Sequence, residues 1–352
     1  MKSRSHHPDG LAPKTMAPSA AAGLLSYLLV ALAPLSTAHA WGAMGHRIIG
    51  RVGMESLPDT VPAFLRTPET IEAVGELARE PDRSRGAGKV HDTMRDPGHY
   101  VNVDDDGKVS GGPPLAALPP TLGDYETALR AVGTETGHAG YLPYSIIDGW
   151  QQLTKDFVYW RIETAALPRQ TDPAHKAWLQ ADLNRREMLI IRDLGIWSHF
   201  IGDASQPLHL TVHYDGWGKF PNPNGYTESR VHSPFEGAFV RRFVSEEAVQ
   251  AALPAPRPCP AIEVCTAQYL AETAATVIPF YEMQKAGGLT GPDPAGRAFT
   301  VQRVAAGAAA LRDLTIAAWE ASAHGALGHP AITIDQVATG AIDPFDALYG
   351  ED

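Results

Sequence analysis

Positive charge is scarce in this chain of 352 residues. It has 29 lysines and arginines against 40 aspartates and glutamates, and its formal net charge is −11. No basic tract interrupts this acidic composition. Broad electrostatic binding to duplex nucleic acid is therefore not expected. A site in which metal ions supply positive charge locally stays compatible with the composition.

Two common catalytic signatures are also missing. The chain has neither a G-x-S-x-G nucleophile elbow nor a glycine-rich phosphate loop. A serine nucleophile on such an elbow, or nucleotide binding through such a loop, is therefore not expected.

No apolar run after residue 40 is long enough to span a bilayer. The run at 20–35 follows Lys2, Arg4 and Lys14, and the small-x-small sequence AHA follows it at 38–40. This arrangement predicts a signal peptide over 1–40, with a retained membrane anchor as the alternative. Because 1–40 hold three basic residues and one acidic residue, the mature chain would carry a net charge of −13. It would begin at Trp41 and be periplasmic or secreted.

Cysteine is nearly absent. Cys259 and Cys265, in the stretch CPAIEVC, are the only two. In an exported chain so close a pair predicts a local disulfide that holds a proline-rich loop, and two free thiols are the alternative.

Helical periodicity dominates what is present. Apolar residues recur at intervals of three and four over 144–167, 174–205, 266–285 and 296–323. Loops rich in proline and glycine separate them at 104–120, 214–229 and 253–261. None of these loops resembles an interdomain linker. The sequence predicts one all-α domain over 41–340 and a short, loosely structured tail over 341–352.

Histidines and carboxylates occur at helical spacing within this frame. The stretch WSHFIGDASQPLH puts His199 and Asp203 four residues apart, so both project from one helix face. Pro207 is expected to end the helix and let His209 fold back, so that one site can hold all three. The alternative for each histidine is a hydrogen-bonded core residue.

Other parts of the chain carry the same chemistry. His232 and Glu236 are again four residues apart, and His99, Asp82 and His46 lie in PGHYVNV, REPDRSR and WGAMGH. Nitrogen and carboxylate ligands without cysteine are typical of a zinc site with a hydrolytic rather than a structural role.

The combined pattern is Trp-x4-His at a processed N-terminus, Asp-x2-Arg, His-Tyr, His-x3-Asp-x5-His and His-x3-Glu. It resembles the trinuclear zinc phosphodiesterases, which are the S1/P1-type nucleases and the bacterial zinc phospholipases C. The resemblance runs from Trp41 to the C-terminal helix. It implies a single, mostly helical domain of the phospholipase C/P1 nuclease type, expected as a monomer.

The resemblance also implies three zinc ions and their ligands. The first ion would be held by Asp82, His99, His199 and Asp203. The second would be held by the α-amino and carbonyl groups of Trp41 with His46 and a bridging Asp203. The third would be held by His209, His232 and Glu236. A water shared by two zinc ions would attack phosphorus, with Asp82 and Asp203 as the catalytic carboxylates that position the metals.

Arg85 matches the position of an arginine that clamps the phosphate in the nucleases. Its planar fork suits two oxygens of the transition state. A surface arginine beside Arg83 is the alternative.

The expected substrate is single-stranded DNA or RNA, or a 3′-nucleotide, because the Trp41–His46 and His209–His232 spacings resemble the nucleases. Tyr100 would stack on a base, and Asn102 stands where the nucleases carry a base-reading aspartate. Glu236, HSPFEGAFV and QRVAAG instead resemble the phospholipases C. In that alternative, the substrate is a phosphatidylcholine-like lipid, and Tyr100 and Trp217 would flank its choline group.

A non-enzymatic zinc-binding exported protein is a more distant alternative. The triple aspartate at 104–106 lacks the alternate spacing of a calcium loop and is interpreted as a solvated turn.

Overall fold

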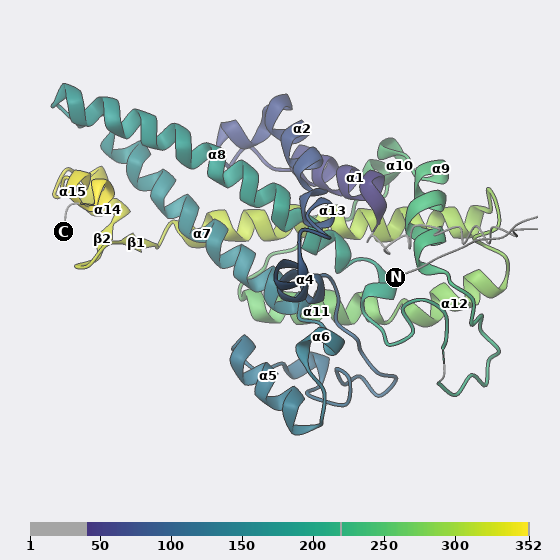
Figure 1. Ribbon diagram of the computed structural model, residues 1–352. Coiled ribbons are helices and arrows are strands. Elements are labelled where there is room, and N and C mark those ends of the chain that lie inside the picture. Colours follow the sequence, from purple (N-terminus) through teal and green to yellow (C-terminus); the bar gives the residue numbers. More distant parts are fainter. Residues whose placement is uncertain (1–40, 219, 351–352) are drawn as a thin grey trace, which may run out of the picture. The chain divides into compact units, whose positions relative to one another are not determined.

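Three long helices form the frame of the protein (Figure 1). They are α7 (Leu142–Ala166), α8 (Pro173–Asp203) and α13 (Pro294–Ser322), and each packs against the other two. The computed structural model describes residues 41–218 and 220–350, which belong to one compact unit. The predicted signal peptide lies outside the described residues.

The starts of α8 and α13 follow from their sequences. Asp172 and Asp293 each precede a proline, and each carboxylate accepts hydrogen bonds from two backbone N–H groups of the first helical turn. Proline at the first helical position costs nothing, because its missing N–H would have had no helical partner there. Both helices therefore start within two residues of the predicted segments.

The shorter helices and turns pack around this frame. The α-helices are α1 (Gly42–Glu55), α2 (Pro68–Leu77), α3 (Glu80–Arg83), α4 (Lys89–Arg95), α5 (Leu122–Ala131), α6 (Thr136–Ala139), α9 (Val240–Phe243), α10 (Glu246–Ala251), α11 (Ile262–Ala274), α12 (Val277–Lys285), α14 (Ile334–Ala338) and α15 (Phe345–Tyr349). Four 3₁₀ turns are η1 (Ala63–Arg66), η2 (Asp96–His99), η3 (Leu115–Ala117) and η4 (Pro207–His209), and η5 (Pro234–Phe239) is a π-helix. Strands β1 (Ala326–Leu327) and β2 (Ile332–Thr333) form a small antiparallel pair. The prediction of an all-α protein is thus confirmed for the described residues.

Close contact between α1 and α13 depends on small residues. A Cβ at Gly53 would lie 2.8 Å from the Leu311 side chain, and one at Gly307 would lie 2.9 Å from Ser205 Oγ and 3.0 Å from Ile49 Cδ1. Helix α1 can therefore approach both α13 and the end of α8.

Two sequence predictions need correction. The segment 266–285 is divided between α11 and α12, because Pro279 has no N–H to bond to the Ala275 carbonyl and its ring would collide with it. The tail is also more ordered than predicted, since α15 places Phe345 8% exposed and stacked on His175 at 3.6 Å between ring centroids.

The apolar core has two large clusters that meet near the end of α8. Trp197 and Ile201 of α8 belong to one cluster, and Trp41 and Phe235 belong to the other. The Trp41 indole donates a 2.8 Å hydrogen bond to the Gly202 carbonyl, which joins the two. The polar residues singled out in the sequence lie at this junction.

The structure joins Cys259 and Cys265 in a disulfide, as predicted, and this pair is consistent with an oxidising compartment. Within the described ranges, no helix has both the length and the apolar character that a membrane crossing requires.

Candidate metal centre

The last turns of α8 place His199 and Asp203 on one face. Both side chains are fully buried, and His199 Nε2 lies 3.4 Å from Asp203 Oδ2. The helix ends at Asp203, four residues before the predicted stop at Pro207. Pro207 instead opens the η4 turn, and Gln206 before it is extended, as a residue preceding proline prefers to be.

His99 reaches the same place from the η2 turn. Its Nδ1 lies 3.0 Å from Asp203 Oδ2 and 2.9 Å from His199 Nε2. Val101, two residues after His99, donates its backbone N–H to the His209 carbonyl over 2.9 Å. This bond ties the His99 segment to the η4 turn.

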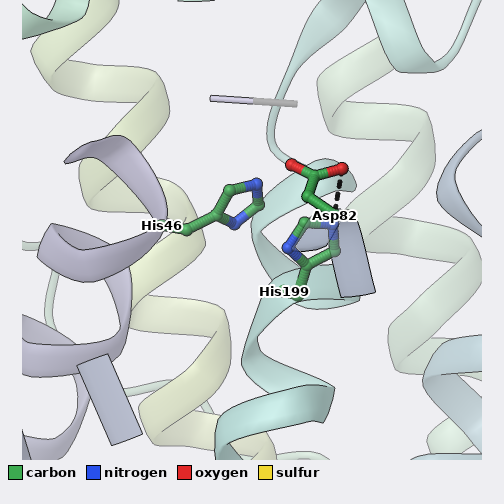
Figure 2. A group of neighbouring side chains, drawn as sticks. All are labelled: His46, Asp82 and His199. Carbon is green, nitrogen blue, oxygen red and sulfur yellow. Dashed lines mark ion pairs between the residues drawn. The ribbon is translucent and has the colours of Figure 1, made fainter. Parts of the chain in front are cut away.

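His46 and Asp82 complete this first group, as Figure 2 shows with His199. The His46 ring, from α1, stacks on His199 at 3.9 Å between centroids, and its Nε2 lies 3.5 Å from Asp203 Oδ1. Asp82 Oδ1, from α3, lies 3.9 Å from His199 Nε2. Elements distant in sequence therefore bring four polar side chains, His46, Asp82, His99 and His199, together with Asp203.

Trp41 stands at the start of α1 and is fully buried. Its indole N–H lies 2.8 Å from both the Gly202 carbonyl and Ser205 Oγ. These contacts fix Trp41 beside the end of α8 and place its backbone at the N-terminal end of the helix that carries His46. Its role as a metal ligand stays a prediction.

His209, His232 and Glu236 form a second group. His232 Nε2 lies 2.8 Å from Glu236 Oε2, and His209 Nε2 lies 3.9 Å from the same oxygen. His232 and Glu236 were expected on an ordinary α-helix, but Glu236 lies in the π-helix η5. The helical spacing suggested one site for His199, Asp203 and His209, whereas His209 groups with His232 and Glu236, the set that the resemblance implies for the third ion.

Backbone carbonyls select the tautomers of two histidines. His199 Nδ1 lies 2.8 Å from the Ala78 carbonyl, and His209 Nδ1 lies 2.5 Å from the His99 carbonyl. In this hydrogen-bond assignment each Nδ1–H donates, so each Nε2 keeps its lone pair for another partner. The same arrangement orients histidines that bind metals.

Burial controls the charge of His99, His199 and Asp203 in the first group and of His209 in the second. It lowers the pKa of His99 and His209 well below the ordinary value and lowers that of His199 to about 3. It also raises the pKa of Asp203 well above its usual range, and the nearby Asp82 carboxylate raises it further. The imidazoles are therefore neutral, the form in which histidine binds a metal.

In the second group, His232 and Glu236 each oppose the effect of burial on the pKa of the other. Burial raises the pKa of Glu236, although the His232 imidazole opposes this effect. Burial alone would lower the pKa of His232, but the Glu236 carboxylate reverses the direction and raises it.

The donor atoms fit a divalent cation. His99 Nδ1, His199 Nε2 and Asp203 Oδ2 lie 2.9 to 3.4 Å apart, and a single shared proton cannot satisfy all three. Asp203 Oδ1, His209 Nε2 and Glu236 Oε1 are buried without a hydrogen-bond partner. Buried polar atoms are rarely left so, and an ion would accept their lone pairs. Three sets of three side chains have the required proximity: His46, Asp82 and His199; His99, His199 and Asp203; His209, His232 and Glu236.

Arg85 is not a surface arginine. Its side chain is 17% exposed, and its Nε lies 3.3 Å from Asp82 Oδ1 and 3.7 Å from Asp96 Oδ1. Its positive charge also opposes protonation of His99, His199 and His209. The guanidinium therefore lies close to both groups.

The residues expected to bind substrate differ in their surroundings. Tyr100 is half-buried, and its hydroxyl donates to the Gly137 carbonyl over 2.8 Å. Asn102 is 6% exposed, and its amide donates to the His138 carbonyl over 2.6 Å, so its side chain is bonded to α6.

Trp217 corrects another expectation. It is 4% exposed and stacks on His213 at 3.7 Å, with its indole N–H bonded to the Pro221 carbonyl. A choline group has no access to such a ring, so Trp217 is a packing residue.

Some supporting residues have no signal in the sequence. Gln206 donates to Glu236 Oε2 over 3.2 Å, and Asp215 accepts the His232 backbone N–H over 3.0 Å. For Gln206, the one signal in the sequence is its position between the proposed ligands Asp203 and His209.

Comparison of the chain with protein-family models, curated proteins and solved structures found no match.

Proposed function

We propose that this chain is a zinc-dependent hydrolase of phosphate esters and phosphodiesters, most similar to the S1/P1 nucleases in activity and in fold type. The observation that supports it is the convergence of eight histidine and carboxylate side chains, from separate segments, into one mostly buried site. Such a donor set, with His99, His199 and His209 kept neutral by burial and with no cysteine, suits zinc with a catalytic role.

These residues would hold three zinc ions, as the resemblance implies. Asp203 offers Oδ1 toward His46 and Oδ2 toward His99 and His199, the arrangement that a bridging carboxylate needs. The second group would hold the third ion. When bound, zinc would activate water and neutralise phosphate oxygens.

The protein's own groups would orient the reaction. The Ala78 and His99 carbonyls fix the rings of His199 and His209. Arg85 is held beside Asp82 and would clamp a phosphate oxygen at the edge of the site. Tyr100 follows His99 directly and presents a half-buried aromatic ring on which a base would stack. Single-stranded nucleic acid and 3′-nucleotides are thus the proposed substrates.

A groove next to the site favours a second candidate, a phospholipase C. Its volume is about 1590 Å³, and it includes Gly98 and Phe200, the sequence neighbours of His99 and His199. Val90 and Met94 of α4 also line it and are 75% and 68% exposed. Exposed apolar side chains four residues apart on one helix would suit an acyl chain.

A side-by-side assay tests the proposal. The mature chain loaded with zinc is offered single-stranded DNA, RNA, a 3′-nucleotide and phosphatidylcholine vesicles, before and after treatment with a chelator. We expect turnover of the nucleic acids, loss with the chelator and recovery with zinc. Turnover of the lipid alone would make the nuclease proposal wrong. Full zinc loading without any turnover would favour the non-enzymatic binding protein.

One double variant separates the two candidate functions further. Val90→Ser with Met94→Ser removes the apolar surface of α4 and leaves the metal ligands unchanged. If the substrate is nucleic acid, its turnover stays within about twofold. If the substrate is a lipid, vesicle hydrolysis falls at least tenfold, because about 0.8 kcal/mol is lost for each methylene that is no longer buried.

A further inference from the structure

A second cavity lies beside the disulfide, lined by residues to which the proposed function gives no role. Its volume is about 330 Å³, and its walls come from the 252–259 loop, α11 and α13. One side is apolar, with Pro254, Ala306, Ala310 and Leu314. This volume lies at the lower end of the range for small-molecule sites.

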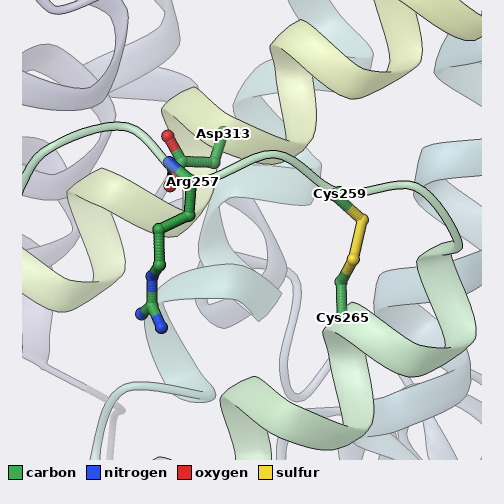
Figure 3. Close-up of a disulfide and its surroundings, with 4 residues drawn as sticks. All are labelled: Arg257, Cys259, Cys265 and Asp313. Carbon is green, nitrogen blue, oxygen red and sulfur yellow. Dashed lines mark hydrogen bonds between the residues drawn. A yellow bond between two sulfur atoms is a disulfide. The ribbon is translucent and has the colours of Figure 1, made fainter.

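Several contacts hold the loop over this cavity. The disulfide joins Cys259 of the loop to Cys265 of α11, and the Arg257 backbone N–H donates to Asp313 Oδ2 over 3.1 Å (Figure 3). Arg312 Nη1 donates to the Pro254 carbonyl over 3.0 Å. Three tethers on one short loop make the cavity a built feature of the fold.

The ion pairs around the cavity leave one of its arginines without a bonded carboxylate. Arg257 forms two hydrogen bonds with Glu272, of 2.8 and 3.0 Å. Asp313 accepts from Nε of Arg312, a residue outside the lining, over 2.7 Å. The lining therefore has two arginines and two carboxylates, but Arg303 has no ion pair with either carboxylate within 4.0 Å.

The guanidinium of Arg303 is also short of hydrogen-bond partners. Its Nη1 is buried with no acceptor in range. Burial lowers the pKa of Arg303 from its ordinary value, yet arginine keeps its charge in proteins. A buried guanidinium nitrogen without an acceptor is costly, whereas a bound anion would supply the missing partner of Nη1.

We infer that this cavity, which we call the Arg303 cavity, binds a small organic carboxylate. The planar fork of arginine matches a carboxylate, and one arginine without a bonded carboxylate matches a ligand with a single carboxylate. The apolar wall of α13 would contact the body of the ligand. Since the volume is small, an aromatic or short aliphatic acid fits, and a long-chain lipid does not.

The test measures binding of 4-fluorobenzoate and of inorganic phosphate to the zinc-loaded mature protein. Fluorine NMR and calorimetry follow the acid, and calorimetry follows phosphate. We expect Arg303→Gln to weaken fluorobenzoate binding at least tenfold. Arg297→Gln, on an exposed part of the same helix, should leave it unchanged. Because both variants keep every proposed zinc ligand, binding at the metal centre is the same in the two.

A cavity-filling variant keeps the test decisive if Arg303→Gln unfolds. Ala310→Phe places a ring in the cavity while Arg303 stays, and fluorobenzoate binding should again be lost. Equal affinity in the parent and in both variants would overturn the inference, as would no binding at all. Loss of phosphate binding alone in Arg303→Gln would overturn the assignment to a carboxylate. None of these readouts depends on hydrolysis.

Discussion

The two groups of the candidate metal centre are built in different ways. His199 and Asp203 occupy consecutive turns of a 31-residue α-helix, and His46 lies on the regular helix α1. His209 lies in a three-residue turn, and Glu236 lies in a six-residue π-helix. Three of the five residues of the first group therefore stand on regular helices, with His99 and Asp82 brought to them by short elements, whereas His209 and Glu236 of the second group both lie in short, irregular elements.

Those hydrogen bonds also connect the groups. The His99 carbonyl accepts from His209 Nδ1, so the backbone of a residue in the first group orients a side chain in the second. The reverse dependence is weaker, because His199 is oriented by Ala78, next to α2. A substitution in the first group should therefore also affect zinc binding in the second, whereas a substitution in the second group should affect only its own ion.

Asp203→Asn gives the most direct test of this asymmetry. The amide keeps the shape but has one oxygen instead of two, so it cannot bridge two ions. We expect loss of zinc at two sites and a fall in activity of about 10³-fold or more, which corresponds to about 4 kcal/mol. Zinc analysis and phosphodiester hydrolysis measure both effects, with Asp346→Asn, exposed on α15, as the control. Three zinc ions in the variant would show that Asp203 does not bridge.

The first residue of the mature chain tests the proposed role of Trp41 as a ligand in the first group. A free α-amino group has a reference pKa of about 7.7 to 8.0, so zinc can displace its proton, whereas a peptide nitrogen has no available lone pair. A chain that starts at Ala40 should fold, lack one zinc ion and be nearly inactive, and one that starts at Trp41 should have both. Equal zinc content and activity in the two chains would exclude the N-terminal ligand.

Glu236→Asp tests the second group. The shorter side chain leaves the carboxylate about one methylene further from His209 and His232, and η5 is held by its neighbours. We expect zinc affinity at this site alone to fall by about 10- to 100-fold, the range found when a supporting contact is lost. Competition with a fluorescent chelator measures it. Tighter retention of zinc would contradict the prediction.

Glu163 of α7 shows what burial does without a metal group. It is fully buried and belongs to none of the metal-compatible sets found among the described residues. Burial, with a contribution from Asp182, raises its pKa from 4.5 to about 8, while Arg186 and Arg185 oppose the shift. The folded chain therefore binds a proton that the unfolded chain releases between pH 4.5 and 8.

Stability should consequently fall as pH rises through this window. Each pKa unit is worth about 1.4 kcal/mol, so the free energy of unfolding should drop by roughly 2–4 kcal/mol between pH 5 and 8 on account of this group. Glu163→Gln should remove that part of the slope in urea unfolding. The exposed Glu320→Gln should not, and parallel slopes in all three proteins would disprove the shift.

Much of the frame could be predicted from the sequence because its signals are local. Apolar periodicity located α7, α8 and α13, and the aspartate-proline pairs at 172–173 and 293–294 stand where α8 and α13 begin. The four-residue spacing of His199 and Asp203 was enough to place both on one face. The break between α11 and α12 was visible at Pro279 but outweighed by the periodicity.

Spacing alone did not decide which donors meet. It does not separate His209 from the Asp203 group, and only the resemblance implied the set of His209, His232 and Glu236 that the fold brings together. In the fold, the extended Gln206 ends the helical path after Asp203, so His209 does not continue the face of α8. Trp217 shows the same limit, since an aromatic ring in a glycine-rich loop proved to be buried. Arg85, by contrast, was expected at the site from its position after Asp82, and it lies beside that residue. Local sequence specifies φ, ψ and the face of a helix. Burial and the pairing of distant polar atoms depend on how whole elements pack.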